Sequence, residues 1–354
     1  MKPVYLADFG LACSLGRGKP EVLAGLRQRS QPVATRHLPG MMGGDFPYHA
    51  IPGSAGDWNE RARELVRRVS EEAGGGLIRN SPLFIATSSF DIGAAERGEA
   101  DIAYDLFAAK VADWLAWTGP VHVISTACTS SLNALLAAHA LLASGEVEDA
   151  LVLGIELDNR LTLAGFAALQ LLSTTTSQPF GLHRDGLVLG EAVAALRLTT
   201  GAASRWRLLG GAHVVDGTQP TGATPSAVVA MHRQALAAAG LGAGEIDLIK
   251  VQAAGSPVND GVEAQGLREV YADMPPLVSL KASVGHAMGA SGAVELALLA
   301  CCLDADAAWP ACRDALDEAL GVTLATVRPE GVRRVMATIL GFGGSHASVV
   351  LERT

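Results

Sequence analysis

An α/β fold made of two similar halves is predicted by three features of this sequence. Of its 354 residues, 49% are hydrophobic and only 18% are charged, so much of the chain must face the interior of a large structure. Short apolar runs alternate with longer helical patterns, which is typical of layered α/β proteins. One order of elements occurs in residues 1–200 and again in residues 203–354, with residues 201–204 as the join. Such a repeat predicts a duplicated fold with a site between its halves.

The first half opens with residues 4–16 (VYLADFGLACSLG) and contains a compact strand–helix–strand unit. Residues 121–126 (VHVIST) are predicted as a buried strand, and residues 150–156 (ALVLGIE) as the next strand. Between them, residues 130–144 are predicted as a helix that stops at Gly145. This helix is apolar almost all round, so we expect it to be buried.

The second half repeats this plan. It opens with residues 206–217 (WRLLGGAHVVDG), and residues 277–280 (LVSL) are predicted as a short strand. A Gly-rich turn then leads into a predicted apolar helix over residues 287–303. Residues 335–340 (VMATIL) are a predicted strand that runs into residues 341–351 (GFGGSHASVVL), where we expect a turn and a return strand.

Composition and charge exclude several classes of protein. The net charge is −9, from 36 acidic and 27 basic residues, so the chain has no basic stripe for nucleic acid. The first residues lack the continuous apolar run of a signal peptide, and no segment approaches about 18 uninterrupted apolar residues. The five cysteines form no C-x-x-C pair, so we expect neither a disulfide scaffold nor a metal site. We therefore expect a cytoplasmic protein with reduced thiols and no membrane contact.

The strongest chemical signal is Cys128 in the segment S-T-A-C-T-S-S, at the predicted strand-to-helix turn. A thiol there meets the unpaired N–H groups and the positive dipole end of the helix, which favour the thiolate. The exposed turn also presents the sulfur above the sheet, as a nucleophile elbow does. The alternative is a small buried core cysteine, since free cysteines usually serve packing.

A second segment, residues 178–196 (QPFGLHRDGLVLGEAVAAL), is punctuated by glycines and leads directly into a strand. We interpret it as a structural loop in which Arg184 and Asp185 are paired. Phe180 is the one residue of the loop for which we do not favour a purely structural role.

Two more segments could complete a site. In residues 278–292 (VSLKASVGHAMGASG), Lys281 and His286 are five apart, and His286 precedes a buried helix. A lone histidine there would more often be a satisfied core residue. The Gly-rich turn at residues 341–347 can offer free backbone N–H groups to an oxyanion.

Five motifs of one known family occur here in the family's order, over essentially the whole chain. They are T-A-C-x-S around Cys128, P-F-x-x-x-R-D-G at 179–186, N-D-x-x-E at 259–263, S-x-K-x-x-x-G-H at 279–286 and G-F-G-G at 341–344. Together they resemble the β-ketoacyl-acyl carrier protein synthases, the condensing enzymes of the thiolase superfamily. The resemblance implies a five-layered αβαβα fold of two similar halves, usually a dimer.

The resemblance also implies how the acyl group is handled. Cys128 would take an acyl chain as a thioester from the phosphopantetheine arm of an acyl carrier protein, with no cofactor bound to the chain itself. The N–H groups of Cys128 and Phe342 would hold the thioester oxyanion. Phe342 would also be the gate that admits or excludes acyl chains.

The supporting residues follow from the same motifs. His286 matches the second catalytic histidine of the family, and Lys281 matches the lysine that supports it. Asp260 and Glu263 match acidic residues that buttress the neighbouring loop and pair with that lysine.

One departure from the family's pattern is as informative as the matches. The family's first histidine lies in A-H-G-T-x-T-P-x-N-D, whereas residues 251–260 read VQAAGSPVND. Ala254 stands where that histidine should be, and the Thr-rich turn is shorter by two residues. Gly181 also replaces the usual Asp after P-F. The resemblance implies that the donors for the malonyl carboxylate and for the enolate are lost.

Three hypotheses remain open. In the first, Cys128 still accepts an acyl group, decarboxylative condensation is impaired, and the chain acts with an intact synthase. In the second, the chain is a non-catalytic partner that only shapes the acyl tunnel, similar to chain length factors or to the synthase-like partners of aryl-polyene pathways. Cys128 speaks against the simplest form of this second hypothesis, because chain length factors usually lose the cysteine. The third is a cysteine hydrolase that uses Cys128 with His286.

The expected partners are an acyl carrier protein and a second subunit, either another copy or an intact ketosynthase. In the family the strand before the nucleophile pairs with its two-fold mate, and residues 121–126 are apolar enough for this role. Carrier proteins are acidic, so a basic patch on the predicted helix at 59–72 could steer docking, the alternative being a solvated amphipathic face. Its candidate residues are Arg61, Arg63, Arg67 and Arg68.

Overall fold

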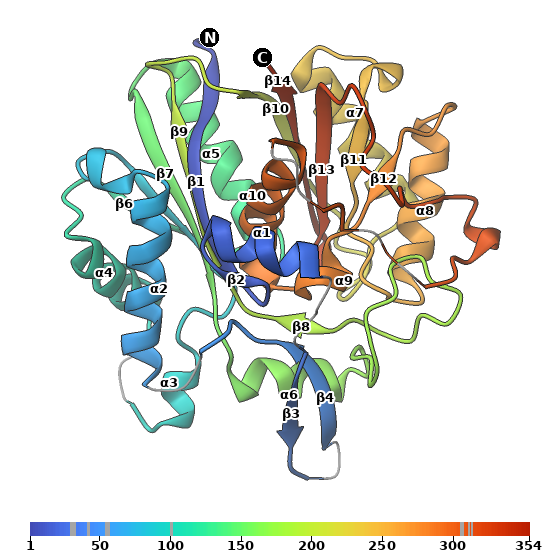
Figure 1. Ribbon diagram of the computed structural model, residues 1–354, viewed down its shortest axis with the longest axis horizontal. Coiled ribbons are helices and arrows are strands. Elements are labelled where there is room, and N and C mark those ends of the chain that lie inside the picture. Colours follow the sequence, from blue (N-terminus) through green and yellow to red (C-terminus); the bar gives the residue numbers. More distant parts are fainter. Residues whose placement is uncertain are drawn as a thin grey trace.

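The fold is known from a computed structural model, which describes residues 1–28, 33–40, 43–53, 57–99, 102–304, 308–310, 312 and 314–354. Apart from the two-residue strand β2 (Gly16–Arg17), its main sheet consists of two five-stranded parts that repeat one strand order (Figure 1). The first part runs β1 (Val4–Cys13), β9 (Ala192–Thr199), β7 (Asp149–Glu156), β5 (Leu83–Ala86) and β6 (Val121–Ile124). The second part runs β10 (Trp206–Val215), β14 (Ser345–Arg353), β13 (Arg334–Leu340), β11 (Leu248–Lys250) and β12 (Leu277–Val278).

Strand directions repeat as well. In each part the first two pairings are antiparallel and the last two are parallel. Strands β1 and β10 pair antiparallel near their ends, with Val4 opposite Leu208, and so join both parts into one continuous sheet. The chain passes between the halves after β9 ends at Thr199 and before β10 begins at Trp206. The duplicated fold predicted from the sequence is therefore confirmed.

Helices complete the five layers, as Figure 1 shows. Helices α2 (Trp58–Glu72) and α4 (Tyr104–Leu115) cover the outer face of the first part. Helices α5 (Ser130–Ser144) and α10 (Ser291–Asp304) lie between the two parts, and α7 (Pro225–Ala239) and α8 (Asn259–Val270) cover the outer face of the second. This is the αβαβα arrangement of the thiolase-like fold.

The central layer explains the apolar character of its two helices. Every residue of α10 from Ser291 to Leu303 is buried. Gly292 allows the close approach of α5, because a Cβ there would lie 2.8 Å from the side chain of Leu132. The segment Ala127–Ser144, which contains α5, is long and apolar enough to cross a membrane by composition, yet α5 packs inside the fold as a core helix.

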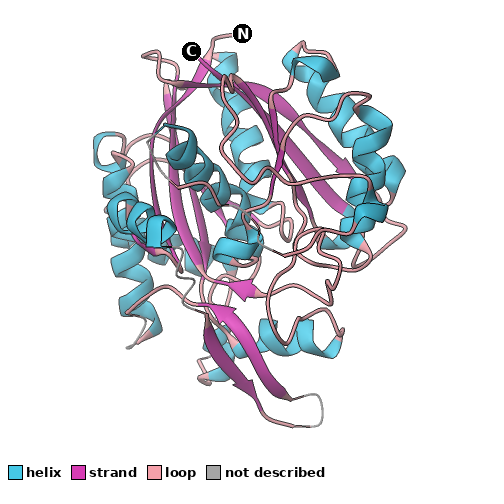
Figure 2. Ribbon diagram, turned by 45° about the vertical axis from the view of Figure 1, so that its right-hand side comes forward, coloured by secondary structure: helices cyan, strands magenta, loops and turns pink. Residues whose placement is uncertain are grey.

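Smaller elements surround this frame. A second sheet, β3 (Ala34–Leu38), β4 (Gly44–His49) and β8 (Leu189–Gly190), projects with α6 (Arg160–Ala168) from one end of the molecule, opposite the two termini (Figures 1 and 2). The remaining elements are β2 (Gly16–Arg17), α1 (Lys19–Gln28), α3 (Gly93–Glu96) and α9 (Lys281–Val284), with short 3-10 helices at Gly75–Leu77, Ala243–Glu245, Met288–Ala290, Glu318–Leu320 and Phe342–Gly344.

Several predicted boundaries change where loops of the candidate site begin. The strand predicted at 121–126 ends at Ile124, and the strand predicted at 277–280 ends at Val278. The first of these was predicted to be buried, which is wrong for the single chain, because it is the edge strand and its residues are partly or fully exposed. The helix predicted at 287–303 is a 3-10 turn followed by α10. At each of these places, the regular strand or helix geometry ends or begins close to a residue of the candidate site.

Candidate active site

Cys128 lies on a tight turn between β6 and α5. Ala127 has a φ of 52°, a left-handed conformation that is uncommon for a residue with a side chain. Ser130 fixes this turn, because its Oγ accepts a hydrogen bond from the N–H of Thr126 at 2.9 Å and donates one to the carbonyl of Ala127 at 2.6 Å. The sequence therefore holds the thiol at a strand-to-helix elbow, as predicted.

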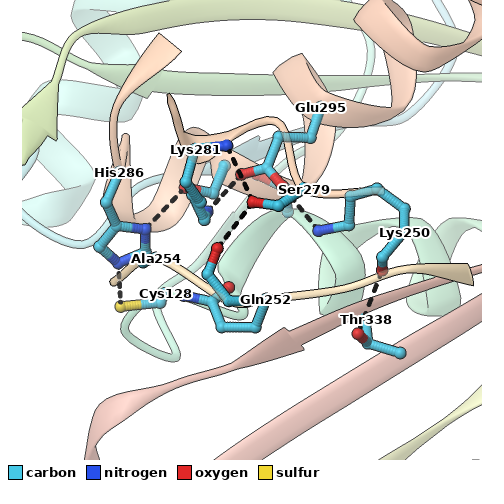
Figure 3. Close-up of polar contacts among 12 residues, drawn as sticks. Cys128, Lys250, Gln252, Ala254, Ser279, Lys281, His286, Glu295 and Thr338 are labelled. Carbon is cyan, nitrogen blue, oxygen red and sulfur yellow. Dashed lines mark hydrogen bonds and ion pairs between the residues drawn. The ribbon is translucent and has the colours of Figure 1, made fainter. Parts of the chain in front are cut away.

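His286 completes a pair with this thiol. Its Nε2 lies 3.0 Å from Cys128 Sγ, although the two residues are 158 positions apart (Figure 3). On the other side of the ring, Ser291 Oγ lies 3.2 Å from His286 Nδ1 and 3.2 Å from Lys281 Nζ. An ammonium group can only donate, so Ser291 Oγ accepts from Lys281 and its own hydrogen is free for Nδ1.

This hydrogen bonding assigns the tautomer of His286. Since Nδ1 accepts, the proton of the neutral ring is on Nε2 and is donated to Cys128 Sγ. Burial lowers the pKa of His286 well below its usual value, and the charges of Lys281 and Lys250 lower it further. His286 is thus a neutral hydrogen-bond donor at physiological pH.

The Cys128 thiol itself is protonated in the resting site. Only 4% of Cys128 is exposed, and burial raises its pKa to about 11. Hydrogen bonds from the backbone N–H of Phe342 and of Cys128, and the charge of Lys281, oppose this rise. The prediction that the helix N-terminus yields a thiolate is therefore wrong for this state, because desolvation outweighs the donors.

The two predicted oxyanion donors both point at the sulfur. They lie on separate segments, one at the elbow and one at the Gly-rich turn, and a hydrogen bond of 2.6 Å between Thr129 Oγ1 and Ser345 Oγ ties these segments together. The ring of Phe342, the predicted gate, stacks on Phe166 of α6 with 5.3 Å between ring centroids. Phe166 was not foreseen, since nothing in the sequence of α6 marks it.

Asp260 and Glu263 are buried and hold the loop that follows β11. Asp260 accepts hydrogen bonds from the N–H groups of Ala254, Gly255, Ser256 and Phe180. Glu263 accepts from the N–H groups of Gln252 and Ala253 at 2.7 Å each. The expectation that these acids pair with Lys281 is wrong.

The acidic partner of Lys281 is instead Glu295 on α10, which also pairs with Lys250 on β11 (Figure 3). Glu295 and Lys250 were not predicted as site residues, although the sequence marks both. Glu295 is the one charged residue in the apolar run AMGASGAVELALLACCL, and Lys250 interrupts the apolar strand L-I-K-V. Charged residues at such places are almost never buried unless paired.

Ala254 lies beside the Cys128–His286 pair, as Figure 3 shows. It is 4% exposed and packs in an apolar cluster that includes Leu187, Leu189 and Met288. Its backbone is fully engaged, with the N–H donating to Asp260 and the carbonyl accepting from Ser177 Oγ at 2.7 Å. Position 254 therefore contributes apolar surface and no side-chain donor.

Two predictions about arginines outside this centre are wrong. Arg184 pairs with Asp317 at 2.7 Å rather than with Asp185. The reason is that the loop carrying Arg184 folds against the segment just before the 3-10 helix at Glu318–Leu320. Arg61 cannot belong to an exposed basic patch, because its side chain is 8% exposed and pairs with the buried Glu191 at 2.5 Å. The other three arginines of the patch, Arg63, Arg67 and Arg68, are exposed.

Family models match both halves of the chain. The model for the N-terminal domain of beta-ketoacyl synthase matches residues 91–203, and the model for its C-terminal domain matches residues 208–313. Together with the duplicated five-layer fold and the cysteine–histidine pair, these matches define the class of protein. The chain belongs to the β-ketoacyl synthase family.

Two curated relatives are larger proteins. A mycocerosic acid synthase-like polyketide synthase of Mycolicibacterium smegmatis is 35% identical over 210 residues, which are 56% of this chain and 10% of that protein. The mitochondrial 3-oxoacyl-[acyl-carrier-protein] synthase of Arabidopsis thaliana is 29% identical over 261 residues, 66% of this chain and 56% of that protein. The chain thus spans a tenth of the first relative and little more than half of the second.

The fold is also shared with a solved structure, that of the ketosynthase ApeO in complex with its chain length factor ApeC from Xenorhabdus doucetiae. The TM-score is 0.86 and the identity 24%, covering 100% of this chain and 98% of that chain. At this identity the likeness concerns the fold.

Thiol labelling tests the special position of Cys128. Burial raises the pKa of Cys13, Cys301 and Cys302 to about 12, above that of Cys128. We therefore expect iodoacetamide at neutral pH to alkylate Cys128 before these three thiols, as peptide mass spectrometry would show. Cys312 is half-buried, so a Cys312→Ala variant is the suitable background. Equal labelling of all four remaining thiols in the folded protein would contradict the prediction.

Proposed function

We propose that this chain accepts an acyl group on Cys128, that its decarboxylative condensation is impaired, and that it acts with an intact ketosynthase. The observation that carries the proposal is the contact of 3.0 Å between Cys128 Sγ and His286 Nε2, next to an alanine at position 254. The nucleophilic thiol and the donor His286 are present, whereas the histidine that the resemblance implies at position 254 is absent. The acyl group would come from the phosphopantetheine arm of an acyl carrier protein in the cytoplasm.

Acyl transfer needs only groups that the site holds. The Cys128 sulfur would attack the thioester carbonyl carbon, and the bond from that carbon to the sulfur of the arm would break. The thiol proton of Cys128 would leave with the sulfur of the arm, so the products are acyl-Cys128 and free phosphopantetheine thiol. The N–H groups of Cys128 and Phe342 would stabilise the oxyanion that forms on the way.

Condensation makes a further demand. Loss of CO₂ from a malonyl thioester forms an enolate, which needs hydrogen-bond donors on its oxygen. His286 can supply one from Nε2, whereas Ala254 supplies none. The proposed chain would therefore accept acyl groups much better than it extends them.

A second candidate is a non-catalytic subunit similar to a chain length factor. It is favoured by the protonated resting state of Cys128, whose pKa is raised to about 11, and by the missing donor at Ala254. The similarity of this chain's fold to the ApeO–ApeC structure is compatible both with a ketosynthase subunit and with a chain length factor subunit.

One experiment separates the two candidates. The chain is incubated with acyl- and malonyl-carrier protein, with and without an intact ketosynthase, and intact mass and CO₂ release are measured. An acyl adduct that disappears in Cys128→Ala supports the first candidate. No adduct under any condition, together with a changed product length when the intact ketosynthase is present, supports the second.

The open edge of the sheet gives a prediction about assembly. β6 is the last strand of the first part, and its residues are partly or fully exposed. A sheet edge with unpaired backbone groups invites pairing with another chain. We expect sedimentation at micromolar concentration to show a dimer of this chain or a complex with its ketosynthase. A monomer in both mixtures would contradict this.

A further inference from the structure

Two lysines share one glutamate in the core behind the candidate active site. Lys250 Nζ lies 2.6 Å from Glu295 Oε2, and Lys281 Nζ pairs with Glu295 Oε1. All three side chains are at most 1% exposed. We call Lys250, Glu295 and Lys281 the charged triad. With both lysines charged, the triad carries one net positive charge in the buried core, where charges act strongly.

The triad is connected to the reactive pair through Ser291. Lys281 Nζ donates to Ser291 Oγ at 3.2 Å, and Ser291 Oγ is 3.2 Å from His286 Nδ1. A carboxylate has two oxygens, and here each oxygen serves one lysine. Because Lys250 occupies Oε2, Lys281 is left at Oε1, within reach of Ser291.

Other titratable groups also face this region, among them Glu156 of β7, whose charge raises the pKa of Cys128. Cys128 comes from the elbow, Glu295 from α10, Lys281 from α9, Lys250 from β11, and His49 lies behind Gly285. His49 is neutral at physiological pH, since burial lowers its pKa to about 4. Burial raises the pKa of Glu263 to about 7 and that of Asp260 to about 6, but both carboxyls face the backbone of the loop after β11.

We propose that Lys250 is a positioning residue of this site: by sharing Glu295, it keeps Lys281 on Ser291 and so holds the Nε2–H of His286 toward Cys128 Sγ. Lys250 has no hydrogen bond to the sulfur or to the histidine. Its charge helps to lower the pKa of His286, and its positioning effect passes through Glu295, Lys281 and Ser291. The segment in which Ala254 supplies no donor thus carries a charged lysine at position 250. This charge helps to hold the remaining donor, the Nε2–H of His286, in place. This inference rests on the proposed function in one respect only, namely that Cys128 and His286 are the reactive pair of the site.

Lys250→Met tests this directly. Without Lys250, Glu295 can turn both oxygens to Lys281, and Ser291 is then free to accept a proton from Nδ1. Long-range ¹H–¹⁵N correlation spectra of ¹⁵N-histidine-labelled protein should show His286 as the Nε2–H tautomer in the unmodified chain and as a mixture of tautomers in the variant. The rate of Cys128 alkylation at fixed pH should fall with the fraction of His286 that leaves the Nε2–H form, about twofold for an even mixture of tautomers.

Matched variants make the test decisive. Lys250→Leu also removes both the charge and the donor to Glu295, so it reports the same change even if Lys250→Met does not fold. Lys250→Arg should restore both the tautomer and the alkylation rate. Lys19→Met, which removes a partly exposed lysine paired with Asp8, should change neither.

Neither readout uses an acyl carrier protein, so failure here is distinguishable from failure of the proposed acyl transfer. A folded Lys250→Met or Lys250→Leu protein with His286 still purely in the Nε2–H form and with unchanged alkylation of Cys128 would overturn the proposal. So would a Lys250→Arg protein that behaves like Lys250→Met.

Discussion

Malonyl decarboxylation by this chain alone is expected to be about 10²–10³-fold slower than by a family member with both histidines, the effect of losing one oxyanion donor. Formation of acyl-Cys128 should remain detectable, because it requires only the thiol, the two N–H donors and a leaving thiol. CO₂ release and intact mass, measured on the same sample, would show the two effects separately. Vigorous condensation without a partner would mean that another group replaces the missing histidine.

Ala254→His is expected to recover part of this loss and less than the full factor. The structure explains the shortfall, because position 254 is buried among Leu187, Leu189 and Met288, and an imidazole must displace part of that cluster. The shortened turn beside it would also misplace the malonyl carboxylate. Ala254→Leu is the matched control, since it adds bulk without a donor and should recover nothing.

Glu295→Gln should have the largest effect on stability. The substitution leaves Lys250 and Lys281 buried without a counter-ion, and breaking such a buried pair typically costs about 3–5 kcal/mol. Urea unfolding followed by circular dichroism would measure this as a lower midpoint. Glu64→Gln, at an exposed ion pair with Arg17, is the control and should leave the midpoint unchanged. Equal midpoints for both variants would show that the charged triad does not hold the core together.

The parts of the fold that sequence predicted well have local signals. Helix α5 begins and ends at the predicted residues, Ser130 and Ser144, because an apolar run meets a glycine with a φ of 87° at position 145. The duplicated strand order follows from a pattern that occurs twice. Strand ends at Ile124 and Val278 were placed too late, since loop residues next to a site can be as apolar as the strand itself.

The sequence predicts which residues belong to the candidate site better than it predicts which residues they contact. Motifs mark Cys128, His286 and Phe342, whereas the partners of Lys281, Arg184 and Arg61 depend on which elements the fold brings together. Asp185 is adjacent to Arg184 in sequence, yet Asp317 is its partner. The protonation of Cys128 also needed the structure, because desolvation is a property of the finished core.

The split of the site between the two halves has a consequence for how such a protein can change. Cys128 and its elbow come from the first half, while His286, Phe342 and the charged triad come from the second. The thiol's turn and the histidine side can therefore diverge separately, although the N–H of Phe342 in the second half still donates to the thiol. The alanine at position 254 and the lysine at position 250 both alter the histidine side and leave the thiol's turn intact. Under the proposed function, a duplicated fold of this kind gives up one reaction step while it keeps the chemistry of the step before.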